Sequence, residues 1–368
     1  MQYPLRRFKP NMNKRFLAVT MLVALALVAS SAFAQEQDTL PAHARFTRLP
    51  AKPSSDATQP ATSLQTWNGT FVYQGTTNHF TMVGTDPSST NTTTTIPVFV
   101  VPVRLGYKGS NGSKTIFDPN TKLSNGKTVI QNVLASPVFA TGIDFKQGGT
   151  DLGNTQYIDA FQRGNFWTNV MTNTNYHVLL GTPTVLPTKT LVVPSADGSV
   201  GNEFGVTVGL ADINWFDTQI NAVIKHYTQI TPTSLVIFVT YDSYLTEGGC
   251  CIGGYHSATG SQTYSHFTYL DHPGVFSQDV SALSHEIGEW MDDPLVNNTQ
   301  GACGGLLENG DPLEGEANYG GYPYTLGGFT YNLQDLVFLR YFGQTPATSV
   351  NGWETFQGTT LSVCQNGQ

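Results

Sequence analysis

The sequence predicts an α+β fold with a mixed β-sheet and one helix that carries a candidate active site. Residues 96–105 (IPVFVVPVRL) and 234–241 (SLVIFVTY) are apolar runs with the length and composition of buried strands. Residues 212–229 and 277–294 instead place apolar side chains at helical spacing. Strands and helices do not alternate regularly, which argues against a purely parallel βαβ fold. The sequence shows no repeat of ~20–50 residues, which disfavours solenoids and propellers.

The composition is typical of a β-rich extracellular protein. Of 368 residues only 12% are charged, whereas 37 are glycine and 11% are aromatic. The formal net charge is −8, from 18 Lys and Arg against 26 Asp and Glu. Nucleic-acid binding requires clustered Lys and Arg, so this balance argues against nucleic acid as a partner.

The N-terminus has the three parts of a secretory signal peptide. Lys14 and Arg15 precede an uncharged apolar run, residues 16–30, which is followed by the A-x-A segment at 32–34. The run is shorter than the ~20 residues that a membrane-spanning helix needs. We therefore predict a signal peptide at 1–34, a secreted or periplasmic product, and no membrane span in the mature chain. An uncleaved N-terminal anchor is the alternative.

The mature chain is predicted to hold one folded domain. Residues 35–66 are rich in Pro, Ala, Thr and Ser without a hydrophobic period, which predicts a linker, and the domain is expected at 67–368. Pro97 and Pro102 place the strand at 96–105 at a sheet edge or a bulge, because proline cannot donate a ladder hydrogen bond. In chain order we expect a loop at 84–95, a strand at 96–105, a helix at 154–170, strands at 176–180 and 190–193, a helix at 212–229 and a strand at 234–241.

Four cysteines lie in the last third of the chain. An even number in an exported protein predicts two disulfides. A bond between the neighbours Cys250 and Cys251 would be strained, so each is expected to pair with Cys303 or Cys364. A structural zinc site is the alternative, but the sequence lacks the paired C-x-x-C segments typical of such sites.

Residues 277–294 (SQDVSALSHEIGEWMDDP) carry the candidate active site. At ~100° per residue the apolar side chains of this helix form one stripe. His285 and Glu289 lie on the opposite side, one turn apart, and Pro294 ends the helix. A helix that buries its apolar face would therefore present both side chains to one site.

The order His-Glu-x-x-Glu is similar to the H-E-x-x-H of zincin peptidases, whose first and last residues bind Zn²⁺. By this comparison His285 and Glu289 are metal ligands, and Glu286 is the general base that activates water. A carboxylate can bind zinc in place of the second histidine, although its charge broadens the choice to other divalent metals. The alternative is a solvated helix face with an incidental histidine.

A second acidic cluster, residues 308–315 (ENGDPLEG), follows the helix. Gly and Pro predict a turn there, which could bring Glu308 or Asp311 back as the third ligand. A polar loop, or a calcium site built from oxygen ligands, is the alternative. Upstream, His256 on a glycine-flanked loop is a further ligand, a transition-state stabiliser or a hydrogen-bonded structural histidine.

Three segments resemble the Exordium (phosphate-induced) family. They are HEIGEWMDDPLVNN at 285–298, E-x-x-D-x-x-E-G at 308–315 and Gly-Tyr-His at 254–256. The resemblance covers residues 230–345 well and implies a secreted protein with a zincin-like core. Leu313 stands where the family has a cysteine, so the disulfide pattern is expected to differ.

These observations predict a metal-dependent hydrolase, in the first place a zinc metallopeptidase that acts on peptides or proteins. The alternative is a non-catalytic extracellular or cell-envelope protein with a structural metal site. Retention of Glu286 favours an enzyme, because a structural site needs no base, whereas replacement of the second histidine favours the alternative. A serine hydrolase is disfavoured because the sequence lacks G-x-S-x-G. The sequence gives no indication of the oligomeric state.

Overall fold

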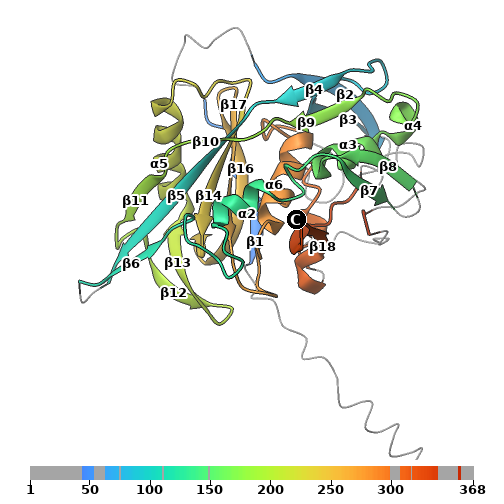
Figure 1. The fold of residues 1–368 in the computed structure, drawn as a ribbon. Coiled ribbons are helices and arrows are strands. Elements are labelled where there is room, and N and C mark those ends of the chain that lie inside the picture. The colour runs from blue at the N-terminus through green and yellow to red at the C-terminus, as the bar shows by residue number, and fades with distance from the viewer. Residues whose placement is uncertain are drawn as a thin grey trace, which may run out of the picture. The chain divides into compact units, whose positions relative to one another are not determined.

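A computed structural model describes residues 44–53, 63–73, 76–109, 112–147, 150–298, 307–315, 317–338 and 355–357 (Figure 1). They belong to one structural unit that starts at His43. The predicted signal peptide lies outside the described residues, as do Cys303 and Cys364. In the described ranges, no helix has the length and apolar character needed to cross a membrane.

An 11-stranded sheet organises the fold, in the order β10-β5-β14-β17-β16-β15-β13-β12, with β1 paired to β16 and with β6 and β11 paired to β5. β14 pairs in parallel with β5 and β17, whereas β16 pairs antiparallel with β17, so the predicted α+β class with a mixed sheet is confirmed. The strands are β1 (Arg45–Arg48), β5 (Val98–Lys108), β6 (Lys114–Phe117), β10 (Thr184–Val185), β11 (Lys189–Val193), β12 (Gly198–Glu203), β13 (Val206–Asp212), β14 (Leu235–Tyr241), β15 (Ser243–Thr246), β16 (Cys250–Thr259) and β17 (Gln262–Tyr269).

Smaller two-stranded sheets and five α-helices complete the described part of the chain. The strand pairs are β2 (Thr66–Tyr73) with β3 (Thr76–Val83), β4 (Thr93–Ile96) with β9 (His177–Leu180), β7 (Ile143–Gln147) with β8 (Thr150–Thr155), and β18 (Gly321–Leu326) with β19 (Phe329–Gln334). The helices are α2 (Val129–Leu134), α3 (Tyr157–Asn165), α4 (Trp167–Val170), α5 (Ile213–His226) and α6 (Ser281–Asp292), with 3-10 turns η1 (Asp311–Leu313) and η2 (Ala317–Gly320).

The main sheet separates two hydrophobic cores. Figure 1 shows α5 and α6 on opposite sides of it. Side chains of β14 alternate between the cores: Ile237 belongs to the same core as Leu283 of α6, whereas Phe238 belongs to the same core as Phe216 of α5. Because both faces of β14 are buried, residues 235–239 are all apolar, and this explains why the run at 234–241 predicted a strand correctly.

Most predicted elements lie within a few residues of the observed ones. The helix expected at 212–229 is α5, whose N-cap Asp212 accepts a hydrogen bond from the Trp215 amide at 2.9 Å. The helix expected at 154–170 starts later and is broken near Phe166 into α3 and α4. The loop expected at 84–95 ends early, because Thr93 begins β4.

The prediction that residues 96–105 form an edge or bulged strand is wrong. β5 pairs with β14 on the path through the sheet and also with β10, β11 and β6. Pro102 is the last β5 residue in the ladder with β14, and the ladder with β6 starts at Leu105. The missing N–H of Pro102 therefore falls where one ladder ends, and Pro97 precedes the strand.

The linker predicted at 35–66 is also wrong for its described central part. Residues 45–48 form β1, and Phe46 is only 2% exposed. Lys52 further along forms an isolated bridge with Thr259. A strand of four residues is too short to produce a recognisable period in the sequence, and its burial depends on a partner 200 residues away.

Residues 250–269 form the hairpin β16–β17, where the sequence suggested a connecting loop around His256. All eight residues of β17 and eight of the ten in β16 are buried. Both strands are rich in Ser, Thr, Tyr and His, and ladder hydrogen bonds satisfy their backbone groups inside the protein. Because their composition is polar, the sequence did not predict that β16 and β17 are buried strands.

The predicted long-range pairing of Cys250 and Cys251 is wrong. These neighbours are bonded to each other at the start of β16, and the peptide between them is cis. They lie where the register between β15 and β16 shifts, opposite Thr246. The ladder is irregular at this point, and the sequence alone gives no sign of such a local feature.

Candidate metal centre

Helix α6 lies deeper than an amphipathic surface helix would. All twelve residues from Ser281 to Asp292 are buried, because β16 and β17 pack on one side and β19 and β3 on others. The side of the helix that carries His285 and Glu289 is therefore enclosed as well. The alternative of a solvated helix face is wrong.

The side chain of Asn309 holds the turn at 307–315 against α6, together with the Gly310 amide, which donates to Oε1 of Glu289 at 3.4 Å. Asn309 donates its amide to the Gly288 carbonyl at 3.1 Å and to the Asp292 carboxylate at 2.8 Å. Gly288 permits this contact, since a Cβ there would lie 2.9 Å from the Asn309 oxygen. The acidic residues of the turn are thereby held against the ligand face of the helix.

Close packing also requires glycine beside His285 and Glu286. A Cβ at Gly310 would lie 2.2 Å from Nδ1 of His285, and one at Gly254 would lie 2.9 Å from Oε1 of Glu286. The turn and β16 thus approach α6 at distances that no other residue allows without a shift.

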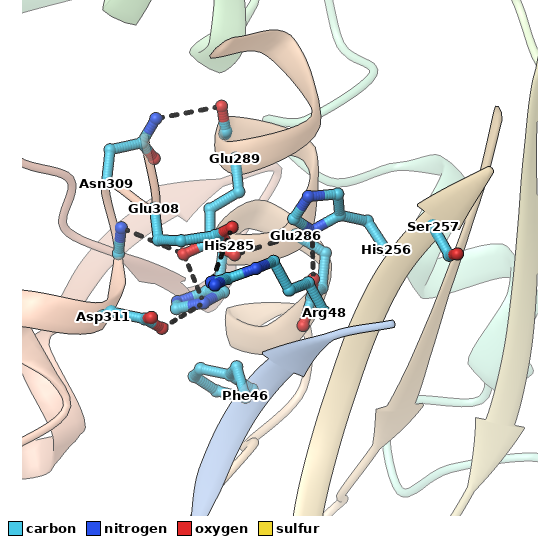
Figure 2. A network of polar contacts seen from close by, with 12 residues as sticks. Phe46, Arg48, His256, Ser257, His285, Glu286, Glu289, Glu308, Asn309 and Asp311 are labelled. Carbon is cyan, nitrogen blue, oxygen red and sulfur yellow. Dashed lines mark hydrogen bonds and ion pairs between the residues drawn. The ribbon is translucent and has the colours of Figure 1, made fainter. Parts of the chain in front are cut away.

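The structure brings together the four residues predicted as ligands and the predicted base (Figure 2). Nε2 of His285 lies 2.9 Å from Oε1 of Glu289 and 3.5 Å from Oδ1 of Asp311. At such separations a cation with ligand distances of ~2.0–2.2 Å can be shared by His285 and Glu289, or by His285 and Asp311. These three side chains come from one helix and one turn.

Glu308 lies on the other side of Glu289. Ligand atoms of Glu308, Glu289 and His256 are within 4.8 Å of one another. Arg48 of β1 forms an ion pair with Glu308, with Nη1 3.1 Å from Oε1. Glu308 therefore has a cationic partner of its own, whereas Asp311 lies beside His285.

Two further residues join the cluster. Ligand atoms of Glu314, His285 and Asp311 are also within 4.8 Å of one another, a role for Glu314 that sequence reasoning missed. The spacing Asp311-x-x-Glu314 was its signal, because one short turn places both carboxylates on the same side. Nδ1 of His256 lies 3.1 Å from Oε2 of Glu286, so this histidine, left open above, contacts the predicted base.

Burial dominates the electrostatics of the cluster. It raises the pKa values of Glu286, Glu289, Glu308 and Glu314 well above the usual range, and neighbouring carboxylates raise them further. Burial, with His285 and Arg48 nearby, lowers the pKa of His256 to about 3. Ionised carboxylates at this density need positive charge beside them.

Several atoms of the cluster are buried without a hydrogen-bond partner. They are both ring nitrogens of His285, Nε2 of His256, Oε1 of Glu286 and Oε2 of Glu289. The 2.9 Å contact between His285 and Glu289 is close but does not have hydrogen-bond geometry. Orphaned nitrogen and carboxylate donors facing one another are the donor set of a divalent cation such as zinc.

No protein-family model, curated protein or solved structure matches the chain. The similarity to the Exordium family and to zincins therefore stays a prediction from residues 254–256, 285–298 and 308–315.

Proposed function

We propose that the protein is a secreted or periplasmic metal-dependent hydrolase that cleaves peptide bonds, with a zincin-like arrangement around α6. The observation that supports this is the convergence of His285, Glu289 and Asp311, with Glu286 beside them, in a buried cluster with orphaned donor atoms. In the order His-Glu-x-x-Glu, His285 and Glu289 would be metal ligands and Glu286 would be the base, and metal-dependent hydrolysis needs both roles.

His285, Glu289 and Asp311 would hold the cation, in the first place Zn²⁺, with Glu314 adjacent. Of the two third ligands that the sequence left open, Asp311 is the better choice because it lies 3.5 Å from Nε2 of His285. Glu308 is committed to Arg48 at 3.1 Å. A divalent cation at such a site supplies Lewis acidity toward a carbonyl and toward water.

Glu286 would act as the general base. Its neighbour His256 contacts it at 3.1 Å and holds the carboxylate in one orientation. From this position Glu286 accepts a proton from the attacking water and returns it to the leaving amine, which divides peptide hydrolysis into two assisted proton transfers.

A non-catalytic protein with a structural metal site is the second candidate. The observation that favours it is closure: His285 and Glu289 are fully buried, and the Phe46 ring lies 4.2 Å from the His285 ring. Structural zinc sites are closed, whereas catalytic ones keep an open position.

Elemental analysis of purified protein, combined with hydrolysis of a peptide library with and without chelator, separates the candidates. Bound divalent metal with chelator-sensitive cleavage supports the hydrolase. Bound metal without cleavage of any peptide supports the structural site, and absence of metal removes both.

A further inference from the structure

Strand β1 lies along the border of the candidate metal centre. It pairs in parallel with β16, where Arg48 is opposite His256, and the Leu49 amide donates to the His256 carbonyl at 3.1 Å. β17 pairs with the other edge of β16. On the edge away from β17, β15 pairs with the start of β16 at Cys250 and Ile252, and the part of that edge next to the cluster is occupied by four residues from a distant part of the chain.

Alternate side chains of β1 face the cluster (Figure 2). The ring of Phe46 lies 4.2 Å from the ring of His285. Two residues later, Arg48 pairs with Glu308 at 3.1 Å. The segment thus places one aromatic and one basic side chain directly on candidate metal-centre residues.

The Phe46 side chain fills a pocket shaped for a large apolar group. It stacks on Phe276 with ring centroids 4.6 Å apart. Gly253 of β16 forms the floor, because a Cβ there would lie 2.7 Å from the Phe46 ring. The Phe46 amide also donates to the Glu314 carboxylate, so the backbone of the segment contacts the cluster too.

We propose that this edge of β16 is the groove that binds an extended peptide, and that residues 45–48 occupy it as an intramolecular ligand. A sheet edge offers N–H and C=O groups to an added strand, and side-chain pockets beside it give specificity. The groove takes a peptide with a large aromatic residue two positions before a basic one. This inference rests on the proposed function, because it names the substrate class of that site.

Residues 45–48 compete with free peptide for the groove. A segment tethered to its own groove acts at an effective concentration of the order of millimolar. Free peptide at micromolar concentration therefore cannot displace it, and weakening its side-chain contacts opens the groove. Closure of the metal centre by Phe46 is then a property of this occupant and not of the site itself.

The test uses the full chain with zinc and a fluorescent peptide of residues 43–50 (HARFTRLP). All binding measurements are made in a Glu286→Gln background, so that the peptide is not consumed. Fluorescence polarisation should show at least tenfold tighter binding to Phe46→Ala/Arg48→Ala than to the parent. The matched control is Arg104→Ala on β5, an arginine outside the segment, whose side chain pairs with Asp118 at 2.7 Å and which should leave affinity unchanged. Equal affinity for all three proteins overturns the proposal.

Cleavage is assayed separately with Glu286 intact. Peptide that binds the double variant tightly but is not cleaved would remove the proposed hydrolase and keep the groove. Cleavage without any gain in affinity would remove the groove and keep the proposed hydrolase. If the double variant fails to fold, the parent is tested by hydrogen exchange with about 1 mM peptide, a concentration that matches the tether. The Leu49 amide should then exchange faster, and unchanged exchange overturns the groove.

Discussion

The two faces of the main sheet bury acidic side chains in opposite ways. On the α5 side, Asp217 is fully buried, and donors surround its carboxylate. The hydroxyls of Tyr255 and Tyr264 donate at 3.0 and 2.7 Å, Asn221 donates at 3.1 Å, and Lys52 forms an ion pair with it. This carboxylate is paired and hydrogen-bonded, as a stable buried charge must be.

On the α6 side, four buried glutamates lie close to Asp311, and the described cationic groups beside them are Arg48, which pairs with Glu308, and Arg45, whose charge acts on Glu314. Both histidines of this cluster have buried ring nitrogens without partners. Strand β16 serves both faces, since Tyr255 points to Asp217 and the next residue, His256, points to the cluster. Both faces bury charge, but the Asp217 carboxylate has all of its partners, whereas the cluster beside α6 keeps buried nitrogen and carboxylate atoms without a hydrogen-bond partner.

Replacement of Asp217 by Ala should have the largest effect on stability. It leaves the buried hydroxyls of Tyr255 and Tyr264 without their acceptor, which costs ~1–3 kcal/mol each, whereas loss of the ion pair with the exposed Lys52 adds little. Urea denaturation measures the loss. Metal content per folded chain should stay at the parent value. An Asp217→Ala variant that lost metal but kept its stability would show that the α5 face binds the metal, which contradicts this comparison.

His285→Ala should abolish most metal binding while the fold persists. Removal of a group that only hydrogen-bonds to a metal ligand already lowers metal affinity ~10–100-fold, and removal of the ligand itself should lower it further. Elemental analysis after dialysis gives the readout. The control is His79→Ala, an exposed histidine on β3, which should retain the metal. Equal metal in both variants would place the site elsewhere.

Gly310→Ala tests the close approach of the turn to α6. The new methyl group would lie 2.2 Å from the His285 ring, so neighbouring groups must shift, and such overpacking lowers the free energy of unfolding by ~1–3 kcal/mol. Thermal denaturation should show the loss together with weaker metal binding. Gly106→Ala is the matched control, because the nearest atom to its Cβ, the Leu191 carbonyl oxygen, is 3.8 Å away.

Asp335 should give the smallest effect, a pH dependence unrelated to metal. Burial raises its pKa to about 6, although the Phe356 amide donates to it at 2.9 Å. A carboxyl whose pKa is higher in the folded than in the unfolded state binds more protons when folded, so stability falls as pH rises. Between about pH 5 and 7 the free energy of unfolding of the parent should fall by ~1 kcal/mol relative to that of Asp335→Asn. Denaturation curves that are parallel across this range would contradict the account.

The parts of this protein that sequence predicts are those fixed by local spacing. The apolar stripe and Pro294 predicted α6 to within four residues at each end, and the i, i+4 rule placed His285 and Glu289 together. The strand β14 was predictable because both of its faces are buried, which demands an apolar run. These signals need no knowledge of the partner elements.

The rest depends on contacts between distant segments. No local pattern shows that β1 pairs with β16, or that Arg48 reaches Glu308. The polar strands β16 and β17 are buried because their groups are hydrogen-bonded, and composition does not record hydrogen bonds. The position of the turn at 307–315 likewise depends on Asn309, whose amide bonds to α6 only in the folded chain.

We propose a catalytic metal centre on the α6 face, and the Glu286→Gln variant tests this proposal. Glutamine keeps the size and polarity of the side chain but cannot accept the proton from water. We predict unchanged metal content and a thermal stability near that of the parent, with peptide hydrolysis reduced by at least the ~10²–10⁴-fold that general acid–base catalysis supplies. A Glu286→Gln protein that hydrolyses peptides as fast as the parent, or that loses its metal, would contradict this account.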